Sequence, residues 1–439
     1  MHRLYNALVW LVTPFALARL FWRSRRTPAY RQRWGERLGL YRTPPPRAEV
    51  WLHAVSVGEV QAAQPLIRHL LGGHRPRTLI VTTTTPTGAQ RLAASFSGAV
   101  AHRYTPFDLP SVIKRFLDHV QPRLVVVMET EIWPNMLEAC EQRGIPVVLA
   151  NARLSERSAR GYARLGRFSR DTFARITCIA AQDETDAARF RALGAPPERV
   201  RVTGSIKFDL RVPASLTERA EVMRRYWGPA RPLWVAASTH AGEEEQVIVA
   251  HRRVLEQWPS ALLVLVPRHP ERFDRVAALA TRRGLPMARR SDGAACSAET
   301  TVFLGDSMGE LQVFLAAADA AFIGGSLVPV GGHNPVEAAA FGIPIAIGPH
   351  VFNFSSVVDH LLMEQGAVKV EDGQALGEQI AAWLGDAAER ARVGENGLRV
   401  VAANRGATER LTALIDALLV NDALHPTAGA HATNDTDRK

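Results

Sequence analysis

The chain has 439 residues, 47% of them hydrophobic and 22% charged, and this composition excludes a largely disordered protein. The length exceeds what one compact core needs and suits two domains of ~200 residues each. Three widely spaced cysteines exclude a disulfide framework or a CxxC motif, and no lysine follows a glycine, which excludes a P-loop.

The net charge of +10 is concentrated at the N-terminus. Residues 1–47 contain ten arginines and one acidic residue, Glu36, so the remainder is almost neutral and nucleic acid is not an expected partner. The same segment holds an apolar run, residues 7–21, which is shorter than the ~20 residues that span a bilayer. We expect this segment to be an anchor on anionic inner-membrane lipids, with the body of the protein on the cytoplasmic side. A buried first helix is the alternative.

Beyond residue 47, short apolar runs alternate with helix-like stretches such as residues 61–71, 109–119 and 243–257. The runs are rich in Val, Ile and Leu without polar alternation, which is typical of strands buried on both faces of a parallel sheet. Repeated strand–helix units predict an α/β protein with doubly wound sheets. The predicted strands are residues 50–54, 78–82, 124–128, 146–149, 176–180, 200–203, 233–237, 261–266, 301–304, 320–323 and 343–347.

The two sets of strand–helix units meet near RVPAS, residues 211–215. They predict two Rossmann-like domains facing an interdomain cleft. The predicted division is a membrane anchor over residues 1–47, an N-terminal domain over 48–210, a C-terminal domain over 211–420 and a flexible tail over 421–439.

Polar and glycine-containing segments follow the predicted strands. Because ligands bind at the carboxyl ends of the strands in open parallel sheets, these segments predict an active site along that edge. They are SVGE (56–59), TTTTPTG (82–88), METE (128–131), NARLSER (151–157), GSIKFD (204–209), ASTHAGEEE (237–245), PRHPER (267–272), GDSMGE (305–310) and GGSLVPVGGHNPVEA (324–338).

Three segments of the second half predict a nucleotide site. In GGHNPVEA, Asn334 suits a helix N-cap and Pro335 the first helical position, so free N–H groups would face a phosphate and Glu337 the ribose hydroxyls. In PRHPER, Arg268 and His269 offer cationic partners for the same phosphate. Backbone groups around Met308–Glu310 are candidates to grip the base. The sequence contains no GxGxxG, which disfavours a dinucleotide cofactor.

The first half is then expected to hold the other substrate and a general base. Glu59 of SVGE is the candidate base, because burial raises the pKa of a carboxyl toward the working pH. Glu129 of METE follows a neighbouring strand, and Lys207 of GSIKFD is a candidate to neutralise charge on a leaving group. The sole D-x-D lies in the tail at residues 435–437, so no metal is expected to chelate a sugar nucleotide.

These motifs resemble those of the bacterial 3-deoxy-D-manno-octulosonic acid (Kdo) transferases of lipopolysaccharide biosynthesis. The resemblance extends from about residue 51 to 345 and lies in SVGEVQAAQPLI, VVVMETEIWPN, NARLSERS, GSIKFD, ASTHAGEE, PRHPER, GDSMGEL and GGSLVPVGGHNPVEAA, in this order. It implies a GT-B glycosyltransferase that transfers Kdo from CMP-Kdo to a lipid A precursor, lipid IVA, with inversion at the anomeric centre. It also implies the cytoplasmic side of the inner membrane as the location, and no metal or other cofactor.

The resemblance also implies roles for individual residues. Glu59 matches the catalytic base, and Glu129 and Lys207 match positions that stabilise the transition state. The residues that match the CMP-binding segments, taken with the neighbouring His269, are Pro267, Arg268, His269, Met308, Gly309, Glu310, Asn334, Pro335, Val336 and Glu337.

Two alternatives stay open from the sequence. One is a GT-B glycosyltransferase that uses another sugar nucleotide, and the other is a non-catalytic peripheral membrane protein that binds a nucleotide.

Overall fold

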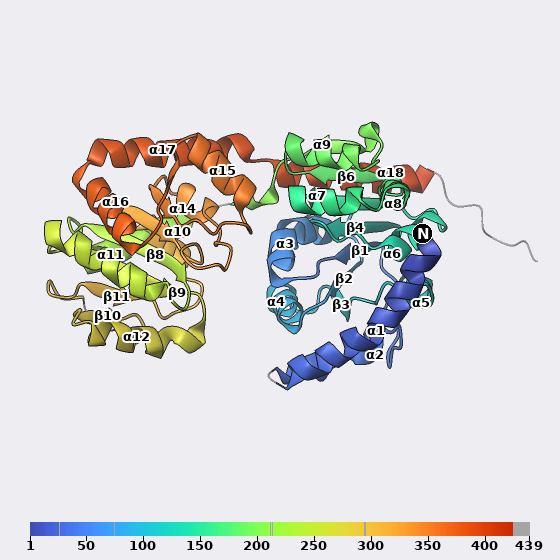
Figure 1. Cartoon of the computed structure of the whole chain (residues 1–439), viewed down its shortest axis with the longest axis horizontal. Helices are drawn as coiled ribbons and strands as arrows, with labels where there is room; N and C mark the ends of the chain where they lie inside the picture. The colour runs from blue at the N-terminus through green and yellow to red at the C-terminus, as the bar shows by residue number, and fades with distance from the viewer. Residues whose placement is uncertain (26, 74, 211, 213, 294–295, 425–439) are drawn as a thin grey trace, which may run out of the picture. The chain divides into compact units, whose positions relative to one another are not determined.

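The computed structural model describes residues 1–424 except 26, 74, 211, 213, 294 and 295. The chain divides into two compact units, which Figure 1 colours along the sequence. Unit 1 comprises Met1–Ile206 and the residues from Gly406 onward, and unit 2 comprises Lys207–Arg405.

Unit 1 contains a parallel sheet of seven strands in the described part of the chain, in the order β3-β2-β1-β4-β5-β6-β7. The order reverses between β1 and β4, and such a switch point is where doubly wound sheets bind ligands. The strands are β1 (Val50–His53), β2 (Leu79–Thr83), β3 (Ala101–Tyr104), β4 (Leu124–Met128), β5 (Val147–Ala152), β6 (Cys178–Ala181) and β7 (Val200–Val202).

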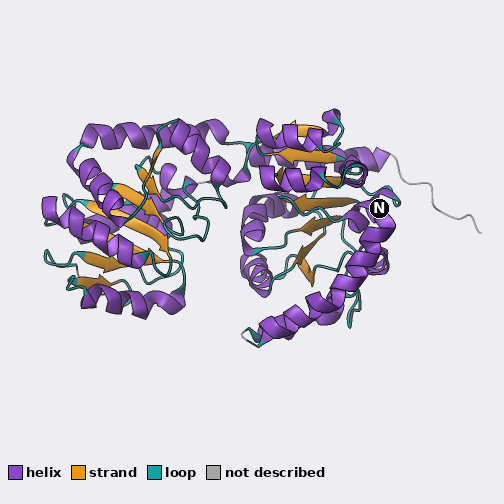
Figure 2. Ribbon diagram, viewed as in Figure 1, coloured by secondary structure: helices purple, strands orange, loops and turns teal. Residues whose placement is uncertain are grey.

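Helices cover both faces of this sheet (Figure 2). Side chains of β1 alternate between two cores: Trp51 packs in one, and Val50 and Leu52 in the other. The helices of unit 1 are α1 (His2–Ser24), α2 (Trp34–Arg37), α3 (Val57–Gly72), α4 (Pro86–Phe96), α5 (Pro110–Val120), α6 (Pro134–Glu141), α7 (Glu156–Ala163), α8 (Arg167–Ala174), α9 (Glu184–Ala192) and α18 (Ala407–Leu424), with 3₁₀ turns η1 (Pro28–Arg31), η2 (Pro197–Arg199) and η3 (Ile206–Phe208), the last at the boundary with unit 2.

Unit 2 repeats the architecture. Its described residues form a second parallel seven-stranded sheet in the order β10-β11-β9-β8-β12-β13-β14, which reverses between β8 and β12. The strands are β8 (Leu233–Thr239), β9 (Leu262–Pro267), β10 (Met287–Arg289), β11 (Val302–Leu304), β12 (Ala320–Ile323), β13 (Ile345–Ile347) and β14 (Ala367–Lys369). The helices are α10 (Ala214–Trp227), α11 (Glu244–Gln257), α12 (Phe273–Arg282), α13 (Leu311–Ala316), α14 (Val336–Ala339), α15 (Ser355–Met363), α16 (Gly373–Gly385) and α17 (Ala387–Asn404), with the 3₁₀ turn η4 (Pro270–Arg272).

The eleven strands expected from apolar runs are present, and the doubly wound α/β fold is confirmed. The three strands missed, β3, β10 and β14, each lie at an edge of a sheet. An edge strand is covered less completely, so it needs no continuous apolar run: β3 reads AHRY and three of its four residues are only partly buried.

The boundaries of the units differ from the predicted ones. Ile206 packs in a core of unit 1 and Phe208 in a core of unit 2, so the chain passes between the units at 206–207 rather than after residue 210. Helix α18, expected in the C-terminal domain, belongs to unit 1, because one apolar face of it (Ala407, Leu411, Ile415, Leu419) packs in a core there. The helix continues to Leu424, past the predicted start of the tail, and residues 425–439 lie outside the described part.

Helix α1 is long and apolar enough to cross a membrane, by length and composition. Its first turn is fixed to unit 1: Tyr5 Oη donates to Asp108 Oδ2 (2.7 Å), and His2 Nε2 lies 2.8 Å from Asn135 Oδ1.

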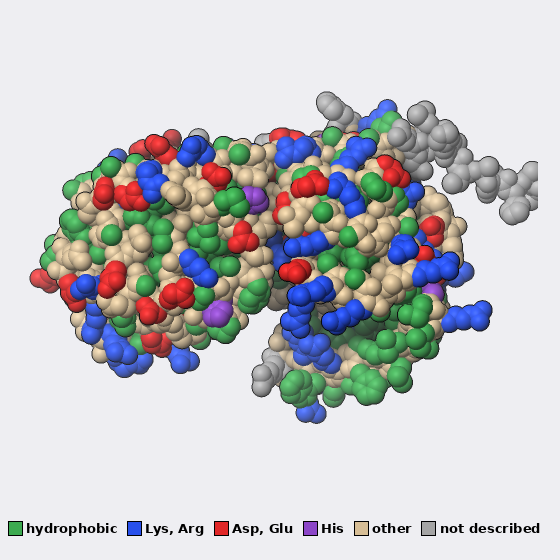
Figure 3. Space-filling view, turned by 45° about the horizontal axis from the view of Figure 1, so that its top comes forward, with side chains coloured by type: hydrophobic (Ala, Val, Ile, Leu, Met, Phe, Trp, Pro, Cys, Tyr) green, Lys and Arg blue, Asp and Glu red, His purple; other side chains and the backbone are tan. Residues whose placement is uncertain are grey.

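The two buried side chains of α1 are polar, Thr13 and Ser24. Many of its exposed side chains are large and apolar, including Leu4, Leu8, Trp10, Leu11, Phe15 and Trp22, and exposed arginines lie among them. Figure 3 shows hydrophobic side chains beside Lys and Arg side chains on this face of unit 1. The usual amphipathic pattern is therefore reversed, with the apolar side facing outward.

Candidate active site

Glu59 lies at the switch point of unit 1, in the first turn of α3 just after β1. Ser56 caps this helix by accepting from the N–H of Glu59 (3.2 Å). In return the Glu59 carboxylate accepts from Ser56 Oγ (2.9 Å) and from the N–H of Val55 (2.9 Å). This is a variant of the capping box, in which the carboxylate accepts the N–H of the residue before the N-cap rather than that of the N-cap itself, and it fixes the carboxylate in one orientation.

The environment of Glu59 favours the protonated acid. Its side chain is 8% exposed, and burial raises its pKa to about 8; the hydrogen bond from Val55 opposes this shift, while the charges of Glu129 and Glu131 add to it. A helix cap alone requires no such value, because caps on exposed helix ends ionise normally. A carboxyl group that titrates near neutral pH suits a general base.

Glu129 and Glu131 follow β4, the strand on the other side of the switch point. Glu129 has a positive φ of 55°, unusual for a side chain of this kind, and its N–H donates to Ala150 O (2.9 Å). Burial raises the pKa of Glu131, which accepts from Trp133 Nε1 (2.9 Å). The fold therefore brings three carboxyl groups together at the carboxyl ends of β1 and β4.

Lys207 lies in the 3₁₀ turn η3 (Ile206–Phe208) and is the first residue of unit 2. Its Nζ lies 4.8 Å from the centre of the Phe354 ring, a cation–π contact within unit 2. The preceding N–H, of Ile206, donates to Asn151 Oδ1 (3.1 Å) in unit 1. Lys207 thus follows a turn held by unit 1 and contacts unit 2, whereas Glu59 and Glu129 belong to unit 1.

The switch point of unit 2 lies between β8 and β12, and Glu243 fixes the loops that follow both strands. Its carboxylate is fully buried and accepts the N–H groups of His240 (3.1 Å), Gly325 (2.7 Å), Ser326 (3.0 Å) and Leu327 (2.9 Å). The loops approach so closely that a Cβ on Gly324 would lie 2.6 Å from Ser238 O. One buried carboxylate therefore sets the backbone of both segments.

The loop after β9 carries two cationic candidates beside this switch point. The N–H of Arg268 donates to Thr239 O (3.0 Å), which ties its backbone to β8. The next residue, His269, stacks edge-on against His240, with ring centres 5.2 Å apart. His333, from the loop after β12, completes the group: its Nε2 lies 2.8 Å from His240 Nε2. We call His240, His269 and His333 the imidazole cluster.

The segment Met308–Glu310 precedes α13. The Glu310 carboxylate is held by Arg290, whose Nε and Nη2 lie 2.9 and 3.1 Å away, and this pairing lowers its pKa. Gly309 has a positive φ of 86°, and Met308 is 65% exposed. The side chain of Glu310 is therefore anchored by Arg290, whereas Met308 and Gly309 are exposed.

The segment Asn334–Glu337 differs from its expected form. Helix α14 is a single turn, Val336–Ala339, with Pro335 at the N-cap position, and Asn334 Oδ1 accepts the N–H of Val336 (3.2 Å). One turn sums too few peptide dipoles to hold a phosphate by itself, so this helix start alone does not make a phosphate site. Burial raises the pKa of Glu337, which accepts from Gln312 Nε2 (3.3 Å).

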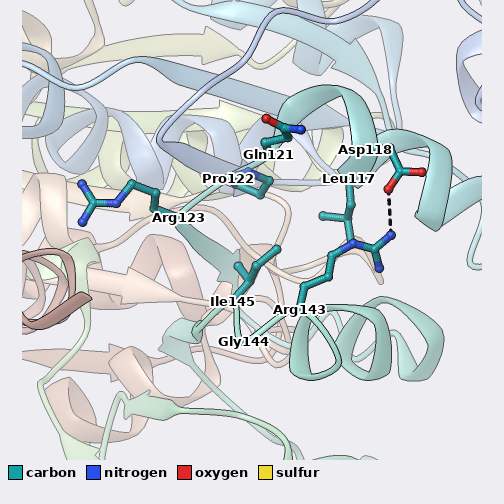
Figure 4. A pocket seen from close by; sticks show the side chains of 8 residues that line it. All are labelled: Leu117, Asp118, Gln121, Pro122, Arg123, Arg143, Gly144 and Ile145. Atoms are coloured by element: carbon teal, nitrogen blue, oxygen red, sulfur yellow. Dashed lines mark hydrogen bonds and ion pairs between the residues drawn. The ribbon is translucent and has the colours of Figure 1, made fainter. Parts of the chain in front are cut away.

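A cavity of about 330 Å³ lies elsewhere in unit 1 (Figure 4). It lies next to the amino ends of β4 and β5, where Arg143 pairs with Asp118 (2.9 Å), and its lining contains none of the predicted site residues. Among the described residues, no group of three or more His, Cys, Asp or Glu side chains is placed to hold a metal ion.

Sequence reasoning missed Glu243, His240 and His333. Their segments were recognised as polar loops, but the contacts that join them connect residues 82 to 93 positions apart. The glutamate run of ASTHAGEEE is the sequence feature that could have indicated Glu243, because a glutamate that is buried in the loop after a strand needs a hydrogen-bonding partner.

Comparison with known proteins identifies the relatives of this chain. Residues 32–210 match the family model of 3-deoxy-D-manno-octulosonic-acid transferase (kdotransferase), and residues 283–400 match that of glycosyl transferases group 1. The 3-deoxy-D-manno-octulosonic acid transferase of Haemophilus influenzae is 43% identical over 415 residues, which cover 94% of this chain and 97% of that protein. The Bordetella pertussis transferase of the same name is 38% identical over 393 residues, covering 87% and 90%.

Solved structures show the same fold at low sequence identity. The UDP-GlcNAc 2-epimerase of Neisseria meningitidis matches with a TM-score of 0.56 at 15% identity, covering 85% of this chain and 99% of that chain. A glycosyltransferase of Rickettsia africae matches with a TM-score of 0.54 at 14% identity, covering 86% and 99%.

Two Rossmann-like units together with these matches define a glycosyltransferase of the GT-B class. The chain belongs to the family of 3-deoxy-D-manno-octulosonic acid transferases, as the resemblance of its motifs implied.

Proposed function

We propose that this glycosyltransferase moves Kdo from CMP-Kdo to a sugar hydroxyl of a lipid A precursor, lipid IVA, with inversion at the anomeric carbon. The observation that carries the proposal is Glu59, a buried carboxyl group at a ligand-binding switch point with a pKa raised to about 8. A direct displacement at a sugar carbon requires one such base on the acceptor side.

The proposed chemistry balances in a single step. The ionised Glu59 carboxylate takes the proton of the acceptor hydroxyl. At the same time the oxygen of that hydroxyl forms a bond to the anomeric carbon of Kdo. The bond from that carbon to the phosphate oxygen breaks, and CMP leaves with the electron pair. Attack from the face opposite the leaving group inverts the anomeric centre.

We assign to unit 2 the residues that would bind the negatively charged donor. Arg268 is the proposed partner of the CMP phosphate, and the segments Met308–Glu310 and Asn334–Glu337 are proposed to hold the nucleoside. Guanidinium groups suit this task because they present two parallel N–H groups to a phosphate. Lys207 and Glu129 are proposed to stabilise the transition state. Lys207 follows a turn whose backbone is held by Asn151, which limits its freedom.

We propose that helix α1 binds the membrane that carries the lipid acceptor. A surface with exposed Leu11, Phe15 and Trp22 beside arginines suits the interface of an anionic membrane. We place the protein on the cytoplasmic side of the inner membrane, where its acceptor would also be anchored. The polar contacts of His2 and Tyr5 with unit 1 favour a helix that lies along the surface over one that leaves the domain to span the bilayer.

The test is a transfer assay with the full-length protein, CMP-Kdo and a tetraacylated lipid A precursor, followed by product mass and the anomeric configuration by NMR. We expect a mass increase of one or more Kdo residues and an inverted linkage. Retention of configuration, or transfer from another sugar nucleotide but not from CMP-Kdo, would contradict the proposal.

A further inference from the structure

Two histidines of the imidazole cluster in unit 2 form a hydrogen bond with each other, and both lie in loops rather than in a helix or strand. The Nε2 atoms of His240 and His333 lie 2.8 Å apart, and the two rings are nearly coplanar, with an interplanar angle of 7°. In this geometry one ring donates and the other accepts, so the two imidazoles share one proton between their facing nitrogens. The pair links the loops after β8 and β12, the two strands of the switch point.

The surroundings of the pair are cationic. His269 lies edge-on to His240, and Arg268 and Arg272 act on His240 as neighbouring positive charges. Arg272 is neutralised by the buried Glu244 (2.8 Å), whereas Arg268 forms no ion pair with any described residue. Glu243 lies nearby, but its carboxylate is occupied by four backbone N–H groups. Two acidic side chains face the edge of the cluster: Glu271 lies 3.9 Å from His269 Nδ1, and Glu337 interacts electrostatically with Arg268. No described carboxylate forms an ion pair with the imidazole of His240 or His333.

These neighbours keep the pair neutral in the empty protein. Burial, together with the charges of His240, Arg268 and His269, lowers the pKa of His333 to about 3, and burial likewise lowers the pKa of His240. An anion placed against the rings reverses this balance, because a nearby negative charge favours the imidazolium form. Binding of an anion and uptake of a proton are then linked.

The donor of the proposed reaction carries two anionic groups, a phosphate and the carboxylate beside the anomeric carbon. Helix α14 is too short to hold either by its dipole, and Arg268 is one cation. We propose that the His240–His333 pair binds one anionic group of the donor, the phosphate or the carboxylate, and takes up one proton when that group arrives. This inference rests on the proposed function and adds two binding residues to it, with a pH-dependent affinity.

The test measures the dissociation constant of CMP-Kdo as a function of pH. The full-length Glu59→Gln variant is used as the background, because it removes both turnover and the titration of Glu59. We expect the dissociation constant to rise about three- to tenfold between pH 7.5 and 8.5, since one linked proton changes affinity by at most tenfold per pH unit.

The matched variants are His333→Gln and His119→Asn in the same background. Glutamine keeps an amide group within reach of His240 but takes up no proton, so the pH dependence should vanish. His119 is exposed at the end of α5 in unit 1, and its variant should keep the wild-type slope. A flat profile before substitution, or an unchanged slope in His333→Gln, would overturn the inference.

CMP itself distinguishes the two anionic groups. Above pH 7.5 its phosphate is fully ionised, since the second pKa of a phosphate ester is ~6. The same slope for CMP assigns the pair to the phosphate, and a slope for CMP-Kdo alone assigns it to the carboxylate.

If the His333→Gln protein does not fold, a second measurement tests the inference without it. The heat of CMP-Kdo binding to Glu59→Gln, measured in buffers of different ionisation enthalpy, should report uptake of close to one proton, and none would overturn the inference. Failure of the proposed function is seen separately, as absence of Kdo transfer by the wild-type protein.

Discussion

The loops at the switch point of unit 1 carry a group of carboxyl side chains, and those beside the switch point of unit 2 carry imidazoles and an arginine, although both units are built on parallel seven-stranded sheets. In unit 1, burial raises the pKa of Glu59 and of Glu131, and the charge of Glu129 adds to both shifts. In unit 2, two of the carboxylates are held inside the fold, Glu243 by backbone N–H groups and Glu310 by Arg290, and the loops beside them carry the imidazole cluster and Arg268.

This contrast shows that the strands place a site and the loops decide its chemistry. We propose that the carboxyl groups of unit 1 accept a proton from a neutral hydroxyl group. We propose that the imidazoles and Arg268 of unit 2 hold an anionic leaving group. The following variants separate the two halves of this division of labour, in order of decreasing expected effect.

Glu59→Gln is expected to lower the rate of transfer by ~10²–10⁴-fold, the usual contribution of a general base. Affinity for CMP, measured by calorimetry, should not change, because the nucleotide is assigned to unit 2. Glutamine also preserves the capping box. Since burial makes ionisation of Glu59 costly in the folded state only, the Tm of the variant at pH 8 should equal or exceed that of the wild type.

The matched control is Glu184→Gln, which changes an exposed glutamate in the first turn of α9, a helix that is also capped by a side chain. It should transfer Kdo at the wild-type rate. An equal loss in both variants would mean that the role of Glu59 is structural.

Glu243→Ala is expected to lower the free energy of unfolding by about 2–5 kcal/mol, because it leaves four buried N–H groups without an acceptor. Chemical denaturation measures this effect. Glu245→Ala, at an exposed position two residues further on, should change the free energy by less than ~0.5 kcal/mol. Similar small values for both would show that the loops of unit 2 do not depend on this carboxylate.

Arg268→Gln is expected to weaken CMP binding by about 1.5–3 kcal/mol, or roughly ten- to a hundredfold, through loss of a charged hydrogen-bond donor. Titration calorimetry gives the value, and Arg275→Gln, an exposed arginine of α12, serves as the control. If CMP binds both variants equally, the phosphate lies elsewhere.

The double variant Leu11→Ser/Phe15→Ser is expected to weaken binding to anionic vesicles by about tenfold, since apolar side chains contribute to insertion by their buried area. Both residues are largely exposed, so the Tm should not change. Met363→Ser alters a similarly exposed apolar residue of unit 2 and should bind vesicles normally. Equal vesicle binding by all three proteins would contradict the role assigned to α1.

Much of the fold was predictable because burial on both faces of a sheet requires continuous apolar runs. Edge strands such as β3 escape that requirement, and the return of α18 to unit 1 depends on a core that the sequence does not identify. The candidate base, Glu59, was recognisable from a local motif, SVGE. The His240–His333 contact was not, because it joins residues 93 positions apart whose separate loops read as ordinary polar turns.

The most direct test of the account is the pH dependence of the single-turnover rate at saturating CMP-Kdo and lipid acceptor. If Glu59 is the base and its pKa is about 8, the rate should rise tenfold per pH unit between pH 6 and 7.5 and level off above pH 8. The residual rate of Glu59→Gln should lack this rise. A wild-type rate that stays constant from pH 6 to 9 would contradict the assignment of Glu59, a buried carboxyl group with a raised pKa, as the base.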